Sequence, residues 1–237
     1  MVLCVLEIMA YTTFSTDNAD YVLQLGNHST ENKQVDIFEG IDALVLETGK
    51  NILQDFVTKK YIHPQYKLPF QYCTDSCIPV FGTDVRGTTV GYLRQGLSGI
   101  IAGLPTFGPE LYYSLSEKRV PNLILDCCAD WNFLSQRPRI ECRNAINARK
   151  VEEYVAPLLA GRLGRKPYLG LIFGAGHMGL KPDLQSKRRR DFTIWNWRNF
   201  NFGKWAGFVE EDLNVVQEAN YNGKGWEIQT HIPNLFD

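Results

Sequence analysis

The stretch YLGLIFGAGH, residues 168–177, decides the predicted fold. Its first six residues form a short apolar run bounded by turn residues, a pattern typical of a strand buried on both faces of a parallel sheet. The glycines that follow let the backbone turn sharply, because glycine has no Cβ atom to clash. His177 is the first polar side chain beyond the run. The stretch therefore predicts an α/β fold with a histidine at the end of a core strand.

Three further apolar runs of this kind lie earlier in the chain, at residues 21–25, 43–46 and 78–81. Helical patterns lie between the runs, and the clearest helix is expected over residues 140–163. Strands that alternate with helices indicate parallel βαβ units with right-handed crossovers. We therefore predict an α/β domain with a central, mostly parallel sheet and flanking helices.

The composition changes after Pro182. A basic tract at residues 187–190 precedes a segment rich in tryptophan, asparagine and phenylalanine. Two partly alternating runs, residues 208–219 and 225–232, then flank an Asn-Gly pair, which is a hairpin signal. We predict an α/β core over residues 1–180 and an antiparallel, β-rich C-terminal extension over residues 181–237, packed on the same domain.

The bulk properties narrow the classes of partner. The 25 basic and 26 acidic residues leave a net charge of -1, so no field of the whole protein gathers nucleic acid or anionic membrane. The six cysteines lack the paired short spacing of a zinc ribbon. Residues 1–14 are apolar but have no basic leader, and no apolar run reaches the length of a membrane helix. We expect a soluble, cytoplasmic protein that does not enter membranes.

Each of the four apolar runs is followed by a residue with an ionisable side chain: His28, Glu47, Asp84 and His177. In an open α/β sheet, ligands bind beyond the carboxyl ends of the strands, where loops and helix N-termini converge. Imidazoles and carboxylates together are the ligands that zinc, manganese and cobalt accept. Each residue also has an ordinary structural interpretation, since a histidine can bond within its loop, Glu47 can cap the next helix and Asp84 can close a turn.

The helix expected from residue 140 carries polar residues on its apolar stripe. At 100° per residue, Arg143, Asn144 and Asn147 share a face with Val151 and other apolar residues. A polar group on a buried face is costly unless it is paired, so these side chains should point at polar partners or into a cleft. One interpretation is a structural bridge from Arg143 to Glu47 or Asp84, and the other is substrate or oxyanion binding.

A dinucleotide site is a competing interpretation of residues 174–179, which fit the pattern G-x-G-x-x-G after a strand. That fingerprint requires a helix that opens on the third glycine, and we expect Leu180 to Pro182 to interrupt one. It also requires a second strand that ends in an acid about 20 residues further on, where this chain has the basic tract instead. The pattern therefore favours a different kind of site.

These residues resemble the TraB/PrgY/Tiki superfamily, which includes pheromone-shutdown proteins, Wnt-inactivating metalloproteases and, more distantly, erythromycin esterases. GAGH at residues 174–177 matches the family's second G-x-x-H motif, and LVLE at residues 44–47 matches the strand that ends in its glutamate. Asp84 resembles the acid after a later strand, and Arg143-Asn144 the polar pair of the long helix. The first G-x-x-H corresponds to Gly26-Asn27-His28 and is one residue short. The resemblance covers about residues 20–180.

The residues and the resemblance together predict a metal-dependent, peptidase-like hydrolase acting on a peptide or a small molecule. His28, His177 and Glu47 would hold a divalent ion (Mn, Co or Zn), and Glu47 would be a ligand or general base. Arg143 would stabilise the oxyanion or bind a substrate carboxylate, with Asn144 and Asp84 also contacting substrate. An esterase-like variant without metal, with a histidine as general base, is a further possibility.

The alternative function is a non-catalytic binding or regulatory protein on the same scaffold. The C-terminal segment interleaves arginines with aromatic residues, a mixture that stacks on and neutralises single-stranded nucleic acid. The structural interpretation of the same segment is a solvated basic loop followed by an aromatic edge strand. The near-zero net charge favours this structural interpretation.

Overall fold

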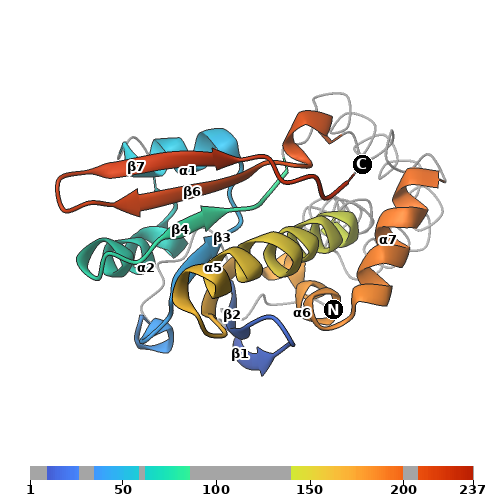
Figure 1. Cartoon of the computed structure of the whole chain (residues 1–237), viewed down its shortest axis with the longest axis horizontal. Coiled ribbons are helices and arrows are strands. Elements are labelled where there is room, and N and C mark those ends of the chain that lie inside the picture. Colours follow the sequence, from blue (N-terminus) through green and yellow to red (C-terminus); the bar gives the residue numbers. More distant parts are fainter. Residues whose placement is uncertain (1–9, 27–34, 59–61, 86–139, 200–207, 237) are drawn as a thin grey trace, which may run out of the picture.

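The computed structural model describes residues 10–26, 35–58, 62–85, 140–199 and 208–236, and these build one seven-stranded mixed sheet (Figure 1). The strand order is β1-β2-β5-β3-β4-β6-β7. The strands are β1 (Ala10–Ser15), β2 (Asp20–Gly26), β3 (Ala43–Leu46), β4 (Val80–Gly82), β5 (Tyr168–Gly174), β6 (Val216–Tyr221) and β7 (Trp226–His231). The central strands β2, β5, β3 and β4 are parallel, and both edges are antiparallel. The predicted α/β class is confirmed.

Helices cover both faces of the sheet. The helices are α1 (Lys50–Val57), α2 (Pro64–Asp75), a helix over residues 140–150 that continues through a π-helical turn (Val151–Val155) into α5 (Ala156–Leu163), α6 (Leu180–Gln185) and α7 (Lys187–Asn199). The long helix that ends in α5 packs on one face, and α1 and α2 pack on the other (Figure 1). This arrangement leaves the carboxyl ends of the parallel strands as the place where loops meet.

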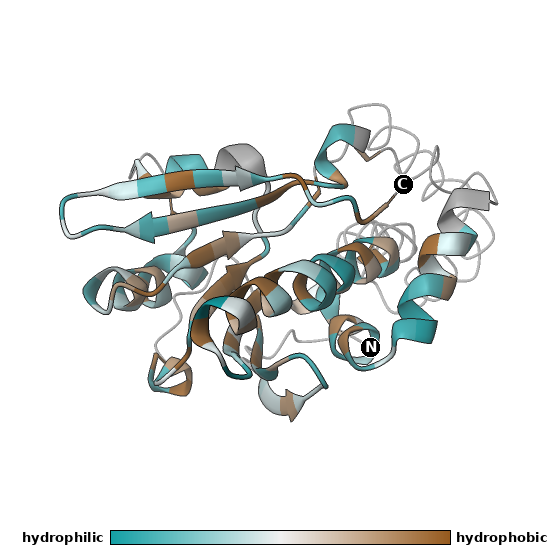
Figure 2. Cartoon of the chain, viewed as in Figure 1, coloured by the Kyte–Doolittle hydropathy of each residue, from teal (hydrophilic) through white to brown (hydrophobic). Residues whose placement is uncertain are grey.

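The alternation along β3 shows why the central strands are apolar throughout. Val45 packs in the core on the side of the long helix, whereas Leu44 and Leu46 pack against α1 and α2. All three side chains are fully buried. Figure 2 shows the same contrast in colour, with apolar central strands and a more polar hairpin of β6 and β7. A strand buried on both faces needs the continuous apolar run that the sequence shows.

The ends of β3 and β4 approach each other closely at Gly82. A Cβ atom at this position would lie 2.8 Å from Thr48 Oγ1 and 2.9 Å from the Thr48 carbonyl oxygen. The Asp84 amide donates to the same carbonyl at 3.1 Å. Glycine therefore lets the segment that carries Asp84 lie directly against the segment that carries Glu47.

Most predicted elements that fall in the described residues are confirmed. The runs at residues 21–25, 43–46 and 168–173 are strands, and the run at 78–81 becomes a strand that begins two residues later, at Val80. The helix over residues 140–163 is present, with the π-helical turn inside it. The hairpin turns where the Asn-Gly signal predicts, with Gly223 at φ 83°.

One prediction about an element is wrong, and one helix was not predicted. The basic and aromatic tract is the helix α7, not a loop and an edge strand, and α6 precedes it, so the extension begins with helices before its hairpin. The helix α2 was not predicted, because Pro64 and Pro69 obscure its pattern.

His28 and the segments between residues 86 and 139 lie outside the described residues. None of the helices in the described ranges has the length and apolar character needed to cross a membrane.

Candidate functional site

The described site residues that the sequence predicts meet at the carboxyl ends of three neighbouring strands. Glu47 follows β3, Asp84 lies two residues beyond β4, and His177 ends a short 3-10 helix after β5 (Ala175–His177). Because β3 pairs in parallel with both β4 and β5, these three ends share one edge of the sheet. The helix over residues 140–150 brings Arg143 and Asn144 to the same edge.

Glu47 lies at the centre of the cluster. Its Oε1 atom accepts a hydrogen bond from Arg143 Nη2 at 2.8 Å and lies 2.9 Å from His177 Nε2. Its Oε2 atom accepts from the Gly174 amide at 2.7 Å. The side chain is 7% exposed, so three partners compensate a carboxylate that has lost nearly all of its water. The alternative that Glu47 caps the next helix is wrong, since Gly49 is the N-cap of α1.

Arg143 bridges two carboxylates. Its Nε donates to Asp84 Oδ1 at 3.0 Å, and its Nη2 contacts Asp84 Oδ2 as well as Glu47. Asn147 Nδ2 also lies 3.4 Å from Asp84 Oδ1. The Arg143 side chain is 21% exposed, more than either carboxylate, so it is the member of the cluster that most faces solvent. The predicted polar partners of the helix stripe are thereby confirmed.

His177 is held at both ring nitrogens. Nδ1 lies 2.5 Å from Asn144 Oδ1, Nε2 faces Glu47, and the ring packs against Phe173 at 5.5 Å between centroids. The ring is 3% exposed. Asn144 and Glu47 therefore fix the orientation of the ring.

Two residues beside the cluster were missed by the sequence-based prediction. Tyr66 on α2 is buried, and burial together with the charges of Glu47 and Asp84 raises its pKa well above the usual value, although Arg143 opposes the effect. Lys150 is buried on the same helix as Arg143. The signal for Lys150 was present, since it lies seven residues after Arg143 and therefore on the same stripe. No comparable signal marks Tyr66, because the helix that carries it was missed.

The structure argues against the dinucleotide interpretation. Residues 187–199 form the helix α7, where the fingerprint requires a second strand. The expectation that Leu180 to Pro182 interrupts a helix is wrong, since α6 begins at Leu180 and holds Pro182 in its first turn, where proline is tolerated. The turn after β5 instead presents His177 to Glu47.

The described residues supply two of the three predicted metal ligands, Glu47 and His177. The third, His28, lies outside them, and within the described ranges no group of three histidine, cysteine or acidic side chains could hold an ion. Arg143 already donates to the Glu47 oxygen that faces His177. A divalent ion at that oxygen would be repelled by the guanidinium, so this arrangement of the pair does not fit one. The metal site stays a prediction that depends on His28.

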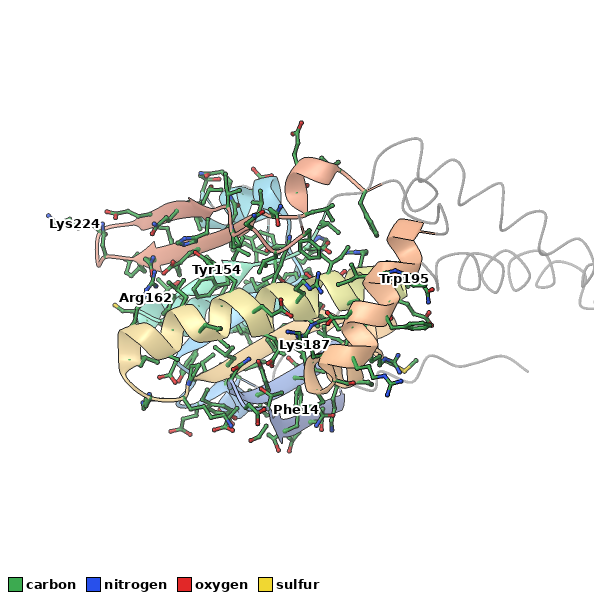
Figure 3. All side chains as sticks on the ribbon, turned by 45° about the vertical axis from the view of Figure 1, so that its right-hand side comes forward. Phe14, Tyr154, Arg162, Lys187, Trp195 and Lys224 are labelled. Carbon is green, nitrogen blue, oxygen red and sulfur yellow. The ribbon has the colours of Figure 1, made fainter. Side chains whose placement is uncertain are left out.

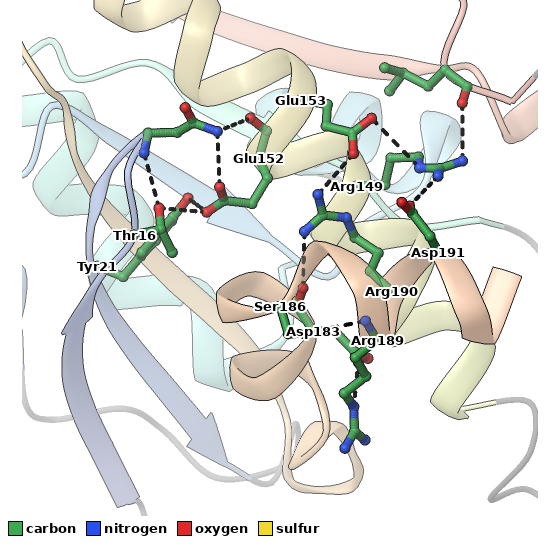
Figure 4. Close-up of polar contacts among 12 residues, drawn as sticks. Thr16, Tyr21, Arg149, Glu152, Glu153, Asp183, Ser186, Arg189, Arg190 and Asp191 are labelled. Atoms are coloured by element: carbon green, nitrogen blue, oxygen red, sulfur yellow. Dashed lines mark hydrogen bonds and ion pairs between the residues drawn. The ribbon is translucent and has the colours of Figure 1, made fainter.

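Two residues of the basic tract of α7, Arg189 and Arg190, form ion pairs within the molecule, as Figure 4 shows. Arg190 is 4% exposed and donates to Glu153 at 2.8 Å and to the Asp183 carbonyl at 3.0 Å. Arg189 pairs with Asp183 at 2.7 Å. These contacts tie α6 and α7 to the long helix and neutralise half of the tract.

Two aromatic side chains of α7 are exposed. Phe192 is 61% exposed and Trp195 is 52% exposed, and their rings stack at 6.4 Å between centroids; Figure 3 labels Trp195 on α7.

Comparison of the chain with protein-family models, with curated proteins and with solved structures finds no match. The resemblance to the TraB/PrgY/Tiki superfamily therefore rests on the short motifs quoted above.

Proposed function

We propose that the chain is a hydrolase whose reaction centre is the Glu47–His177 pair, with Arg143 as the group that stabilises developing negative charge. The observation that carries this proposal is the contact of one carboxylate oxygen, Glu47 Oε1, with both His177 Nε2 and Arg143 Nη2. An acid-base pair next to a cationic hydrogen-bond donor is the minimum that acyl-group hydrolysis needs.

The steps follow from the contacts. A water molecule that attacks a carbonyl carbon loses a proton, and the Glu47–His177 pair takes up that proton, while the contact of His177 Nδ1 with Asn144 holds the ring in place. The carbonyl oxygen becomes negatively charged as the bond to the water oxygen forms, and Arg143 donates hydrogen bonds to it. The pair then returns the proton to the leaving group as its bond to carbon breaks. The substrate class consistent with this scheme is an ester or amide, including a peptide.

The sequence-based form of the proposal adds a divalent ion on His28, Glu47 and His177, which would supply a hydroxide nucleophile. Metal analysis of protein purified without an affinity tag tests this part separately. One ion per molecule of wild-type protein, lost in H177A and H28A and retained in H63A, would support the metal site. No bound ion in active wild type would restrict the mechanism to the residues described above.

The test of the proposed function is hydrolysis of a panel of p-nitrophenyl esters and short peptides. We expect turnover by wild type and a loss of at least 100-fold in kcat in E47Q, since general acid-base catalysis contributes about 10²–10⁴-fold. The exposed D75N variant, on α2, is the control and should keep full activity. Turnover that E47Q retains would overturn the proposal.

A second candidate function, nucleic-acid binding, is favoured by one observation: α7 exposes Phe192 and Trp195 next to the exposed Arg188. Base stacking on aromatic rings contributes about 1–3 kcal/mol per base. Binding of a short single strand that weakens with added salt and is lost in F192A would support this function. A flat titration of wild type at low salt would remove it.

A further inference from the structure

Lys150 is a fully buried cation whose partners are backbone carbonyls. Its Nζ atom donates to the Thr83 carbonyl at 2.9 Å and to the Asp212 carbonyl at 2.8 Å. Across the described part of the chain, no carboxylate forms an ion pair with it. Two acceptors are what a neutral amine can satisfy with its two N–H groups, whereas an ammonium has a third. The two carbonyl groups around Lys150 Nζ therefore suit the uncharged amine as well as the charged one.

Three residues of one helix face hold the segment that carries Asp84. Arg143 and Asn147 contact the Asp84 carboxylate, and Lys150 binds the carbonyl of the preceding residue, Thr83. Their spacing of four and then three residues places them on successive turns of the same face. Lys150 also ties this segment to the 3-10 helix Glu210–Asp212 through the Asp212 carbonyl.

We propose that Lys150 is a positioning residue: it fixes the segment of Asp84, and through Asp84 its charge sets how firmly Arg143 is held against Glu47. The inference deepens the proposed function by adding a regulator of the residue assigned to oxyanion stabilisation. Lys150 donates to the Thr83 and Asp212 carbonyls, so its link to the site runs through the segment that carries Asp84.

The charge on Lys150 changes in the physiological range. Burial lowers its pKa to about 7, and the charges of Asp84 and Asp212, the two acidic groups that face it, only partly offset this effect. On the lysine's own helix, Arg143 is the cation that shares Asp84 with it. A protonated Lys150 competes with Arg143 for the negative charge of Asp84, and a neutral one does not. The ion pair between Asp84 and Arg143 should therefore become stronger as pH rises through about 7.

The test is the ¹⁵N NMR signal of the Arg143 Nε–H group, followed from pH 5.5 to 8.5 on the full chain and identified with R143K. In wild type this signal should shift with a midpoint near 7. In K150Q, which keeps a neutral donor, the signal should persist without that titration. In K150M, which keeps none, its hydrogen exchange should accelerate at least tenfold. K166M, which removes an exposed lysine paired with Asp20, is the matched control and should titrate as wild type does.

A titration in K150Q that matches wild type would overturn the inference, because it would show that a group other than Lys150 causes the shift. Should K150M fail to fold, K150Q still decides. The measurement needs no substrate, so an absence of hydrolysis would remove the proposed function and leave this result standing. Spectra that do not change with pH, together with normal hydrolysis, would remove the inference about Lys150 and leave the proposed function standing.

Discussion

Removal of Arg143 should strongly destabilise the chain, because this residue compensates two carboxylates that have lost most of their water. In R143M, Glu47 and Asp84 keep their burial but lose their shared cation. We expect the free energy of unfolding to fall by about 3–5 kcal/mol, the range for breaking one partner of a buried ion pair. Urea denaturation measures this change.

The control for that experiment is R165M, which removes a 58%-exposed arginine paired with Asp42. Exposed pairs contribute little, because solvent screens them. The double variant R143M/D84N should recover part of the lost stability, since it removes one of the orphaned charges. Equal effects of R143M and R165M would contradict the account of a buried network.

Lys150 makes stability depend on pH with the same sign as ordinary acid denaturation, but in a higher pH range. Its pKa falls from an unfolded value of 10.5 to about 7, so between these values the unfolded chain binds the extra proton. The free energy of unfolding of wild type, taken relative to K150M, should therefore rise with pH over this window, by about 1.4 kcal/mol per pH unit. Chemical denaturation at pH 7, 8 and 9 provides the values. A difference that stays constant with pH would contradict the lowered pKa.

The candidate site shows what residue patterns can and cannot predict. Glu47, Asp84 and His177 were found because each follows a buried strand, and Arg143 and Asn144 because they interrupt an apolar stripe. Their pairing was left open, since either carboxylate could have taken the arginine; in the structure both do. Tyr66 reaches the cluster from α2 by tertiary packing, which no local pattern records.

At the scale of elements, Gly82 controls how closely β4 approaches the chain beyond β3. The variant G82A places a Cβ within 2.9 Å of a backbone oxygen, which cannot move aside as a side chain can. We expect a loss of stability of about 1–3 kcal/mol from overpacking, together with displacement of Asp84. Thermal and urea unfolding of the purified variant measure the loss.

Gly161 on α5 provides the matched glycine control. It is exposed, and a Cβ atom there meets nothing within 4 Å. Alanine favours a helix over glycine by about 0.5–1 kcal/mol, so G161A should stabilise the chain while G82A destabilises it. Two changes of the same sign would show that close approach at Gly82 is not the cause.

The elements also show where local pattern fails. The buried strands were predicted because burial on both faces leaves a signature in the sequence itself. The helix α7 was missed because its polarity has no clear period, and ion pairs to Asp183 and Glu153 hold it in place instead (Figure 4). Those partners lie on other elements, so the local sequence of the tract does not indicate a helix.

At the scale of the whole molecule, the sheet brings together residues that are far apart in the sequence, as the contact of Glu47 with His177 across 130 positions illustrates. The parallel core places strand ends together, and the long helix lies across them with its polar stripe toward the same edge (Figure 1). The described part of the chain thus has one buried polar cluster at the place where α/β proteins bind their ligands. That coincidence is the central reason for proposing a reaction there.

The most direct measurement is the hydrolysis rate of wild type compared with E47Q and H177N, with all three proteins shown to be folded by circular dichroism. The account predicts turnover by wild type and a loss of at least 100-fold in each variant, because both residues belong to one acid-base pair. The double variant should lose little more than either single variant, since the two residues act as a unit. Turnover near the wild-type rate in either folded variant would contradict the account.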